Sequence, residues 1–249
     1  MNWLAELIHF NQRNLDRWVA RVAAEVPAGS SVLDVGAGGA PYRSLFRHCN
    51  YQTQDFCQLS NDQLVQGQYA PIDHVSDITA VPVDSASYDV VLSTEVIEHV
   101  PQPILALKEM DRILKPGGSL YLSAPLGSGL HQEPYHFYGG YTPYFYRRVL
   151  GELGYADIQV IPKGGSFGHF AQWLIWYFKA ANPSATSMPG ALQLIAWPFY
   201  LLQLPLVILM FFYSRLIDRY DRVRQFTGGY CVIAKKPSLA SSPESTSHV

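Results

Sequence analysis

The chain has 249 residues and a formal net charge of -2. This length suits one α/β domain that carries an insertion. The composition shows no basic excess, so we expect no nucleic-acid partner. The three cysteines, Cys49, Cys57 and Cys231, have no spacing typical of a disulfide framework or a zinc site, and a reducing, cytosolic environment fits them best.

The N-terminal segment predicts an amphipathic helix over residues 3–25, because apolar side chains recur there every three or four positions. Charged residues from Glu6 to Arg21 interrupt its apolar character, so we do not expect a secretory signal. A strand at 31–35, a glycine-rich turn and a helix at 42–48 are predicted next.

Strands and helices are predicted to alternate along the rest of the chain. Strands are predicted at 51–56, 72–75, 88–93, 119–124, 157–161 and 229–235, and helices at 103–114 and 144–153. Thr142 is expected to cap the second of these helices, with Pro143 in its first turn. This order predicts an α/β fold: a Rossmann-like doubly wound, mostly parallel seven-stranded sheet with an apolar helical insertion before the last strand. Such sheets bind ligands beyond the carboxyl ends of their strands.

Two features at the predicted strand ends indicate a nucleotide-like cofactor. The turn at 36–40 carries little side chain, which lets the backbone approach a ligand closely. Asp55 ends the second strand about twenty residues later, where a carboxylate accepts hydrogen bonds from ribose hydroxyls. A dinucleotide-binding dehydrogenase shares both features, and either feature alone also suits an ordinary turn.

Four segments strongly resemble, in order and spacing, the successive motifs of class I S-adenosylmethionine-dependent methyltransferases that act on small molecules. They are residues 32–40, 77–78, 88–100 and 114–125. The run LKPGGSL at 114–120 is the most specific of them. One departure is Ala40, where many relatives have a third glycine, and the helix-packing role of that position tolerates alanine.

The resemblance implies cofactor-binding roles for eight residues. They are Asp34, Gly36, Gly38, Asp55, Asp77, Ile78, Ser93 and Thr94. The first three would shape the turn around the amino-acid end of S-adenosylmethionine, and Asp55 would hold the ribose. Asp77 would accept a hydrogen bond from the adenine amino group, while Ile78 would pack on the adenine face. Ser93 and Thr94 would line the methionine portion and face the methyl acceptor.

Methyl transfer from a sulfonium requires donor and acceptor to be in line, and a base is useful for the acceptor's proton. The candidates are His136 and His131, in a tyrosine-rich segment expected to cover the acceptor, and His99. The alternative for that segment is a packed aromatic lid without a chemical role.

Residues 93–100 are similar to a stretch of ubiquinone-pathway O-methyltransferases in which two glutamates and a histidine bind a divalent cation. The equivalent residues here are Glu95, Glu98 and His99. Because the same pattern is structural in other relatives, we expect no metal.

Residues 180–214 contain no Asp, Glu, Lys or Arg. The apolar part at 192–213 is long enough to cross a bilayer, but Pro198 and Pro205 interrupt it. The strands on either side of the insertion belong to one sheet, so the chain must return to its starting side. We therefore predict a re-entrant or in-plane helical hairpin at a membrane, with arginines from Arg215 to Arg224 able to meet anionic lipid. The alternatives are a buried cap, a dimer interface or a tunnel for a long-chain acceptor.

The predicted organisation is a methyltransferase domain at 1–166 and 225–237, the insertion at 167–224 and a disordered tail at 238–249. The predicted function is S-adenosylmethionine-dependent methyl transfer, with oxygen the favoured atom, to a lipophilic or lipid-linked small molecule or glycan on the cytoplasmic side of a membrane. The rivals are a soluble small-molecule methyltransferase with a hydrophobic cap, a nicotinamide-dependent oxidoreductase and a non-enzymatic membrane-bound scaffold. The sequence determines neither the acceptor nor the oligomeric state.

Overall fold

The computed structural model describes residues 10–238, which form two compact units. The sheet unit comprises residues 15–161 and 229–238, and the hairpin unit comprises residues 10–14 and 162–228. The start of the predicted N-terminal helix, before residue 10, lies outside the described residues. So does the predicted disordered tail beyond residue 238.

Seven strands form one sheet in the order β3-β2-β1-β4-β5-β7-β6. They are β1 Ser31–Val35, β2 Asn50–Asp55, β3 His74–Val75, β4 Tyr88–Thr94, β5 Leu114–Pro125, β6 Ile158–Pro162 and β7 Gly229–Lys235. β1 pairs in parallel with β2 and β4, β4 pairs in parallel with β5, and β7 is antiparallel to β5. The predicted Rossmann-like, mostly parallel seven-stranded sheet is confirmed.

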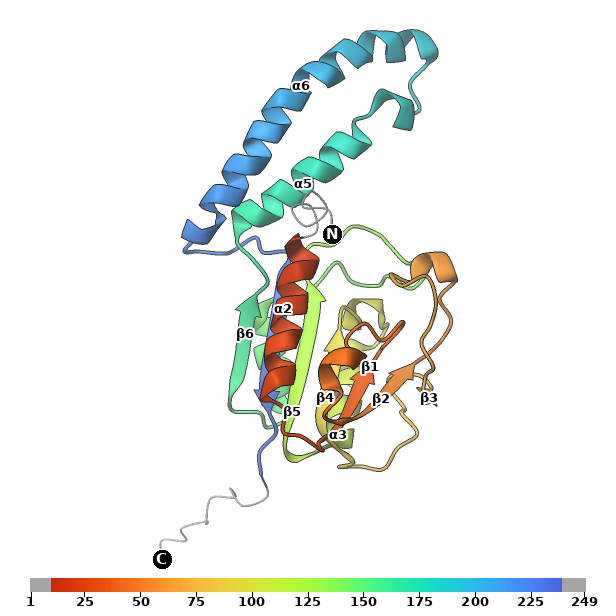
Figure 1. The fold of residues 1–249 in the computed structure, drawn as a ribbon, viewed down its shortest axis with the longest axis vertical. Helices are drawn as coiled ribbons and strands as arrows, with labels where there is room; N and C mark the ends of the chain where they lie inside the picture. The colour runs from red at the N-terminus through yellow and green to blue at the C-terminus, as the bar shows by residue number, and fades with distance from the viewer. Residues whose placement is uncertain (1–9, 239–249) are drawn as a thin grey trace, which may run out of the picture. The chain divides into compact units, whose positions relative to one another are not determined.

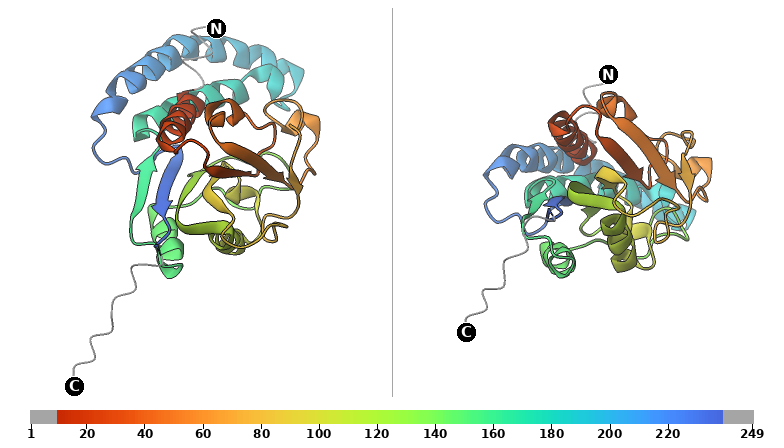
Figure 2. Two further views of the ribbon diagram at one scale, coloured as in Figure 1. Left: turned by 60° about the horizontal axis from the view of Figure 1, so that its bottom comes forward. Right: turned by 90° about the horizontal axis from the view of Figure 1, so that it is seen from below.

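Helices cover both faces of this sheet (Figures 1 and 2). On one face, helix α2, Phe10–Glu25, and the 3-10 helix η1, Arg43–Phe46, bury Val19 and Phe46 in a core with the strands. On the other face, α3, Pro103–Ile113, and α4, Pro143–Glu152, bury Leu107 and Leu150. Because both faces are covered, the strand ends remain for ligand binding.

Several local boundaries differ from the sequence predictions. The helix expected at 42–48 is the shorter η1, because few residues separate the glycine turn from β2. The third strand is reduced to His74–Val75. β5 begins at Leu114 and not at the predicted residue 119, because Gly117 donates a backbone hydrogen bond to the Lys236 carbonyl at 3.0 Å. The predicted start of α4 is confirmed, with the Thr142 side chain accepting from the Phe145 amide.

The hairpin unit contains two apolar helices, α5 Ser166–Ala180 and α6 Gly190–Ile217. They run in opposite directions, so the chain returns toward its starting point (Figure 1). Leu174 and Phe211 are buried in a small core between them. The Tyr177 hydroxyl donates a hydrogen bond to Gln203 Oε1 at 2.6 Å, which adds a polar link between the helices.

Pro198 and Pro205 lie inside α6, so our expectation that they interrupt the apolar segment was wrong. A proline removes one backbone donor and bends a helix, but helical residues on both sides can continue it. Figure 1 shows α6 as one bent helix.

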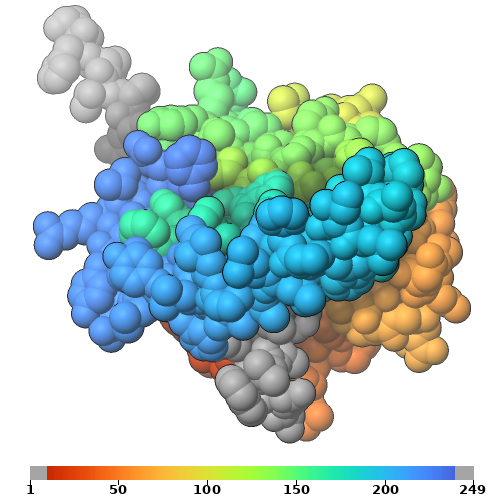
Figure 3. Space-filling model, turned by 90° about the horizontal axis from the view of Figure 1, so that it is seen from above, coloured from red at the N-terminus to blue at the C-terminus, as the bar shows by residue number. Residues whose placement is uncertain are grey.

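The surface of α6 is strongly apolar. The span Gly190–Tyr220 is long and apolar enough to cross a membrane. Its most apolar stretch has a mean hydropathy of 2.0, and 11% of that stretch is buried. Leu194 and Leu202 are each 75% exposed, and Phe199 and Leu209 also point outward. In Figure 3 the side chains of α6 form a continuous blue band. This low burial distinguishes α6 from the core helix of a soluble protein, which is mostly buried.

Candidate active site

The glycine-rich turn after β1 adopts a conformation that requires glycine. Gly36 and Gly38 have φ values of 73° and 53°, in the left-handed region that favours this residue. The Gly36 amide donates to the Gln54 carbonyl at 2.8 Å, which ties the turn to the end of β2. A Cβ on Gly36 would lie 2.5 Å from Val96 Cγ2, so a larger residue at position 36 would force Val96 to move.

Asp55 is buried at the end of β2 and holds this turn. Its Oδ2 accepts a hydrogen bond from the Gly38 amide at 2.8 Å, and its Oδ1 accepts one from the Cys57 amide at 2.9 Å. Burial raises the pKa of the Asp55 carboxyl, while these amide hydrogen bonds act in the opposite direction. The carboxyl therefore shapes the turn at the position where a ribose contact was predicted.

Asp34 is buried within β1, and its Oδ2 accepts a hydrogen bond from the Tyr51 hydroxyl. Burial raises the pKa of Asp34 to about 7; the Tyr51 hydrogen bond lowers the pKa, and the negative charge of Asp55 raises it further. The carboxyl thus titrates near neutral pH. A positively charged ligand nearby would favour its ionised form.

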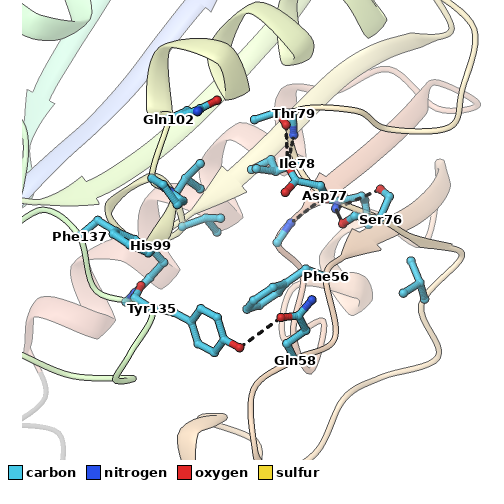
Figure 4. Close-up of a pocket in the computed structure, with 16 residues that line it drawn as sticks. Phe56, Gln58, Ser76, Asp77, Ile78, Thr79, His99, Gln102, Tyr135 and Phe137 are labelled. Atoms are coloured by element: carbon cyan, nitrogen blue, oxygen red, sulfur yellow. Dashed lines mark hydrogen bonds between the residues drawn. The ribbon is translucent and has the colours of Figure 1, made fainter.

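A cavity of about 640 Å³ opens beside the turn, at the carboxyl ends of the strands. Gly36 lines it from the end of β1, and Asp77 and Ile78 line it from the segment after β3. The Asp77 Oδ1 accepts hydrogen bonds from the amide and hydroxyl of Thr79 at 2.8 and 2.6 Å, which orient the carboxylate. Figure 4 shows His99 across the cavity from Asp77. Three predicted cofactor residues and one predicted catalytic residue therefore share one cavity.

The remaining predicted cofactor residues are not among the residues that line this cavity within the described chain. They are Asp34, Gly38, Asp55, Ser93 and Thr94. Ser93 is buried in β4, and its hydroxyl has no hydrogen-bond partner among residues 10–238. Thr94 is the last residue of that strand. The structure thus places these five residues in the strand ends and the turn that surround the cavity.

The three histidines predicted as catalytic form one cluster. His99 belongs to the 3-10 helix η3, Ile97–His99, while His131 and His136 come from the loop between β5 and α4, called the histidine loop below. The ring centroid of His131 lies 4.7 Å from that of His99 and 4.5 Å from that of His136. The amides of Phe137 and Tyr138 donate to the Glu98 carbonyl at 3.0 and 3.1 Å, which fastens the histidine loop to η3.

Burial keeps part of this cluster uncharged. The His99 Nδ1 donates a hydrogen bond to the Tyr135 carbonyl at 2.8 Å, and burial lowers the pKa of His99 to about 4. Burial also lowers the pKa of His136. The His136 Nε2 lies 3.1 Å from the Ser128 hydroxyl oxygen, and its buried Nδ1 has no hydrogen-bond partner in the part of the chain described.

Two aromatic residues close one side of the cavity: Phe56, which the sequence did not assign to the site, and Tyr135, from the tyrosine-rich segment expected to cover the acceptor. Phe56 and Tyr135 pack edge to face with ring centroids 5.1 Å apart, and the Tyr135 hydroxyl donates to Gln58 Oε1 at 3.1 Å (Figure 4). Phe56 directly follows Asp55, so extending the predicted site past the end of β2 would have included it. Tyr135 belongs to the segment that the sequence predicted to cover the acceptor.

Residues 7–174 match the model of a protein family described as a methyltransferase domain. A sarcosine/dimethylglycine N-methyltransferase of Halorhodospira halochloris is 26% identical over 165 residues, which cover 59% of this chain and 59% of that enzyme. A ubiquinone biosynthesis O-methyltransferase of Xanthomonas campestris pv. campestris (strain B100) is 32% identical over 123 residues, or 45% of this chain and 49% of that enzyme. The matches thus span about half to three-fifths of these relatives.

Among solved structures, phosphoethanolamine N-methyltransferase 2 of Haemonchus contortus, in complex with phosphomonomethylethanolamine and S-adenosylhomocysteine, has a similar fold. The TM-score is 0.51 with 17% sequence identity, and the similarity covers 91% of this chain and 53% of that one. At this identity the likeness shows the fold alone. The family match, which covers more than half of the chain, carries the assignment. The chain therefore belongs to the methyltransferase-domain family, and the predicted membership of the class I S-adenosylmethionine-dependent methyltransferases is confirmed.

Proposed function

We propose that this chain binds S-adenosylmethionine and transfers its methyl group to an oxygen atom of a lipophilic or lipid-linked acceptor. One observation carries the cofactor proposal: Gly36, Asp77 and Ile78, from two separate motifs, line the same cavity at the strand ends. In class I methyltransferases these motifs serve the donor, and the cavity has room for it beside an acceptor.

The proposed contacts follow the order of the motifs. Asp34, Gly36 and Gly38 shape the turn at the amino-acid end of the cofactor, and Asp55 holds the ribose. Asp77 accepts from the adenine amino group and Ile78 packs on the adenine ring, with Ser93 and Thr94 near the methionine portion. The ammonium group at the amino-acid end of the cofactor would favour the ionised form of the Asp34 carboxyl.

The histidine cluster supplies the proposed base. The acceptor hydroxyl gives its proton to an imidazole, its oxygen attacks the methyl carbon, and the electrons of the broken C–S bond remain on sulfur. Of the three histidines, His99 lines the cavity, and the buried Nδ1 of His136 has no hydrogen-bond partner among the described residues. The Nδ1 atoms of His99 and His131 instead donate hydrogen bonds to the carbonyls of Tyr135 and Gly129, at 2.8 and 2.9 Å.

The hairpin unit supports a membrane location. Helix α6 exposes large apolar side chains, while the strands that flank the hairpin, β6 and β7, belong to the same sheet. Both ends of the hairpin therefore start from one compartment. An in-plane or re-entrant attachment on the cytoplasmic side satisfies this constraint and would bring a lipophilic acceptor near the enzyme.

Cofactor binding is tested by calorimetry on the purified protein with S-adenosylmethionine and, separately, NADH. We expect S-adenosylmethionine alone to bind. Asp55→Ala should lower the affinity roughly ten- to a hundredfold, since it removes a charge-assisted contact worth about 1.5 to 3 kcal/mol. Asp84→Ala, at an exposed turn before β4, is the control and should bind like the wild type. Binding of NADH, or unchanged affinity in folded Asp55→Ala, would contradict the proposal.

The acceptor class is tested with methyl-labelled S-adenosylmethionine and fractionated cell extracts. We expect the label to enter the lipid fraction with the wild-type protein, and to enter it more slowly with Asp55→Ala at the same S-adenosylmethionine concentration. Label recovered solely in water-soluble compounds would favour a soluble small-molecule acceptor.

A further inference from the structure

Three side chains at the edge of the cavity lie close enough to share a metal ion. The candidate ligand atoms of Glu98, His99 and His131 are all within 4.8 Å of one another. The Glu98 Oε1 and His99 Nε2 are 3.7 Å apart. Ligands at about 2.0 to 2.2 Å from a tetrahedral zinc ion lie roughly 3.5 Å from each other. The distance between Glu98 Oε1 and His99 Nε2 already fits this spacing. The exposed His131 side chain would reach it with a shift of only about 1 Å.

Both imidazoles direct Nδ1 at a backbone carbonyl, which fixes their tautomer. The Nδ1 atoms of His99 and His131 donate to the backbone carbonyls of Tyr135 and Gly129, at 2.8 and 2.9 Å. A neutral imidazole that carries its hydrogen on Nδ1 presents a lone pair on Nε2. Histidines that bind metals commonly donate their second nitrogen to a carbonyl in this way, which fixes the tautomer and the ring orientation. Aromatic packing alone does not require this arrangement.

The histidine loop that supplies His131 is held firmly against the rest of the site. Its base is closed by the Gly127 amide, which donates to the Gly139 carbonyl at 2.7 Å. The Gln132 side chain donates to the Gln63 carbonyl at 2.9 Å. Together with the hydrogen bonds to the Glu98 carbonyl, these contacts keep His131 beside His99.

We propose that Glu98, His99 and His131 bind one divalent ion of the zinc class. From the sequence we expected no metal, and the pattern considered there included Glu95. In the structure Glu95 Oε1 accepts from the Ser123 hydroxyl at 2.7 Å, and the third candidate ligand beside Glu98 and His99 is His131.

The ligand set suggests how the ion would act, and this role rests on the proposed function. Two imidazoles and one carboxylate are a ligand set of catalytic zinc, which leaves the fourth position open. His99 lines the cavity, so an acceptor hydroxyl in the cavity can occupy that position. A bound ion would make such a hydroxyl more acidic, and an imidazole of the histidine cluster would accept its proton.

The test uses the full chain in detergent, freed of metal and titrated with Co²⁺. We expect one equivalent to produce a visible d–d absorption band that Zn²⁺ abolishes. His131→Ala should lower the affinity at least about a hundredfold. His131→Cys should restore binding and add a sulfur-to-cobalt charge-transfer band, which a structural role of His131 would not produce. His48→Ala, at an exposed histidine before β2, should match the wild type.

An absent d–d band in the wild type would overturn the site. So would wild-type affinity in His131→Ala, or a His131→Cys protein that binds Co²⁺ without the charge-transfer band. S-adenosylmethionine binding is measured on the same samples. Cofactor binding without a metal site would refute this inference alone, and metal binding without cofactor binding would refute the proposed function alone.

Discussion

Asp34 lies in β1, just before the glycine-rich turn, and its ionisation affects the stability of the fold. Its pKa is about 7 in the folded chain against the usual 3.8, because the carboxyl is buried. Between about pH 4 and pH 7 the folded state keeps a proton that the unfolded state has lost. The free energy of unfolding therefore falls as the pH rises through this window, by up to about 4 kcal/mol, and then stays level.

Asp34→Asn should remove this pH dependence, since its amide cannot ionise. The stability of the variant relative to the wild type should thus increase from about pH 5 to about pH 8. Urea unfolding of both proteins without cofactor measures this difference, and contributions of other groups cancel in the comparison. Parallel stability profiles for the two proteins would show that Asp34 is ionised throughout.

At the scale of elements, the connection from β1 to η1 depends on glycine. In Gly36→Ala the new Cβ would meet Val96 at 2.5 Å while the residue keeps a positive φ. The turn must then move, and we expect the affinity for S-adenosylmethionine to fall at least about tenfold. The matched control is Gly151→Ala in α4, where a Cβ meets no heavy atom within 4 Å.

Gly151→Ala should bind the cofactor normally and gain up to about 1 kcal/mol of stability, because alanine has a higher helix propensity than glycine. Calorimetry and thermal unfolding of both variants check these outcomes. If Gly36→Ala bound S-adenosylmethionine as tightly as the wild type, the turn would not be the cofactor site.

For the whole molecule, the exposed face of α6 is expected to decide where the enzyme resides. Leu202 and Leu209 are 75% and 66% exposed. Each buried leucine contributes about 1.5 to 3 kcal/mol, so the double change Leu202→Lys and Leu209→Lys should lower vesicle binding at least about a hundredfold. Co-sedimentation with vesicles of anionic lipid measures this effect.

Val65→Lys, at an 88% exposed position of the sheet unit, is the control and should sediment like the wild type. Wild-type protein that remains in the supernatant would contradict membrane attachment. If the two lysines lowered the melting temperature but left sedimentation unchanged, α6 would be a buried cap instead. A tag near Ser187 that is protected from protease on the cytoplasmic side would indicate a hairpin crossing the bilayer twice.

The parts of the site that were predictable lie at strand ends. Gly36, Asp77 and Ile78 follow directly after β1 and β3, and such positions can be identified from local apolar runs and the motifs that end them. The packing of Tyr135 on Phe56 and the pairing of His131 with His99 were not predictable. Their positions depend on the histidine loop meeting η3, and hydrogen bonds between residues far apart in the chain leave no periodic signal.

The sequence by itself determined the α/β class and the number of strands, since spacing of apolar residues is a local property of each element. It also identified the family from its motifs, and the family match confirmed this. Only the tertiary structure decided that β5 runs on from α3, that α6 continues through Pro198 and Pro205, and that three histidines from two segments share one site. Each of these depends on which distant backbone or side chain supplies a hydrogen bond or packing surface, and that is settled only when the chain has folded.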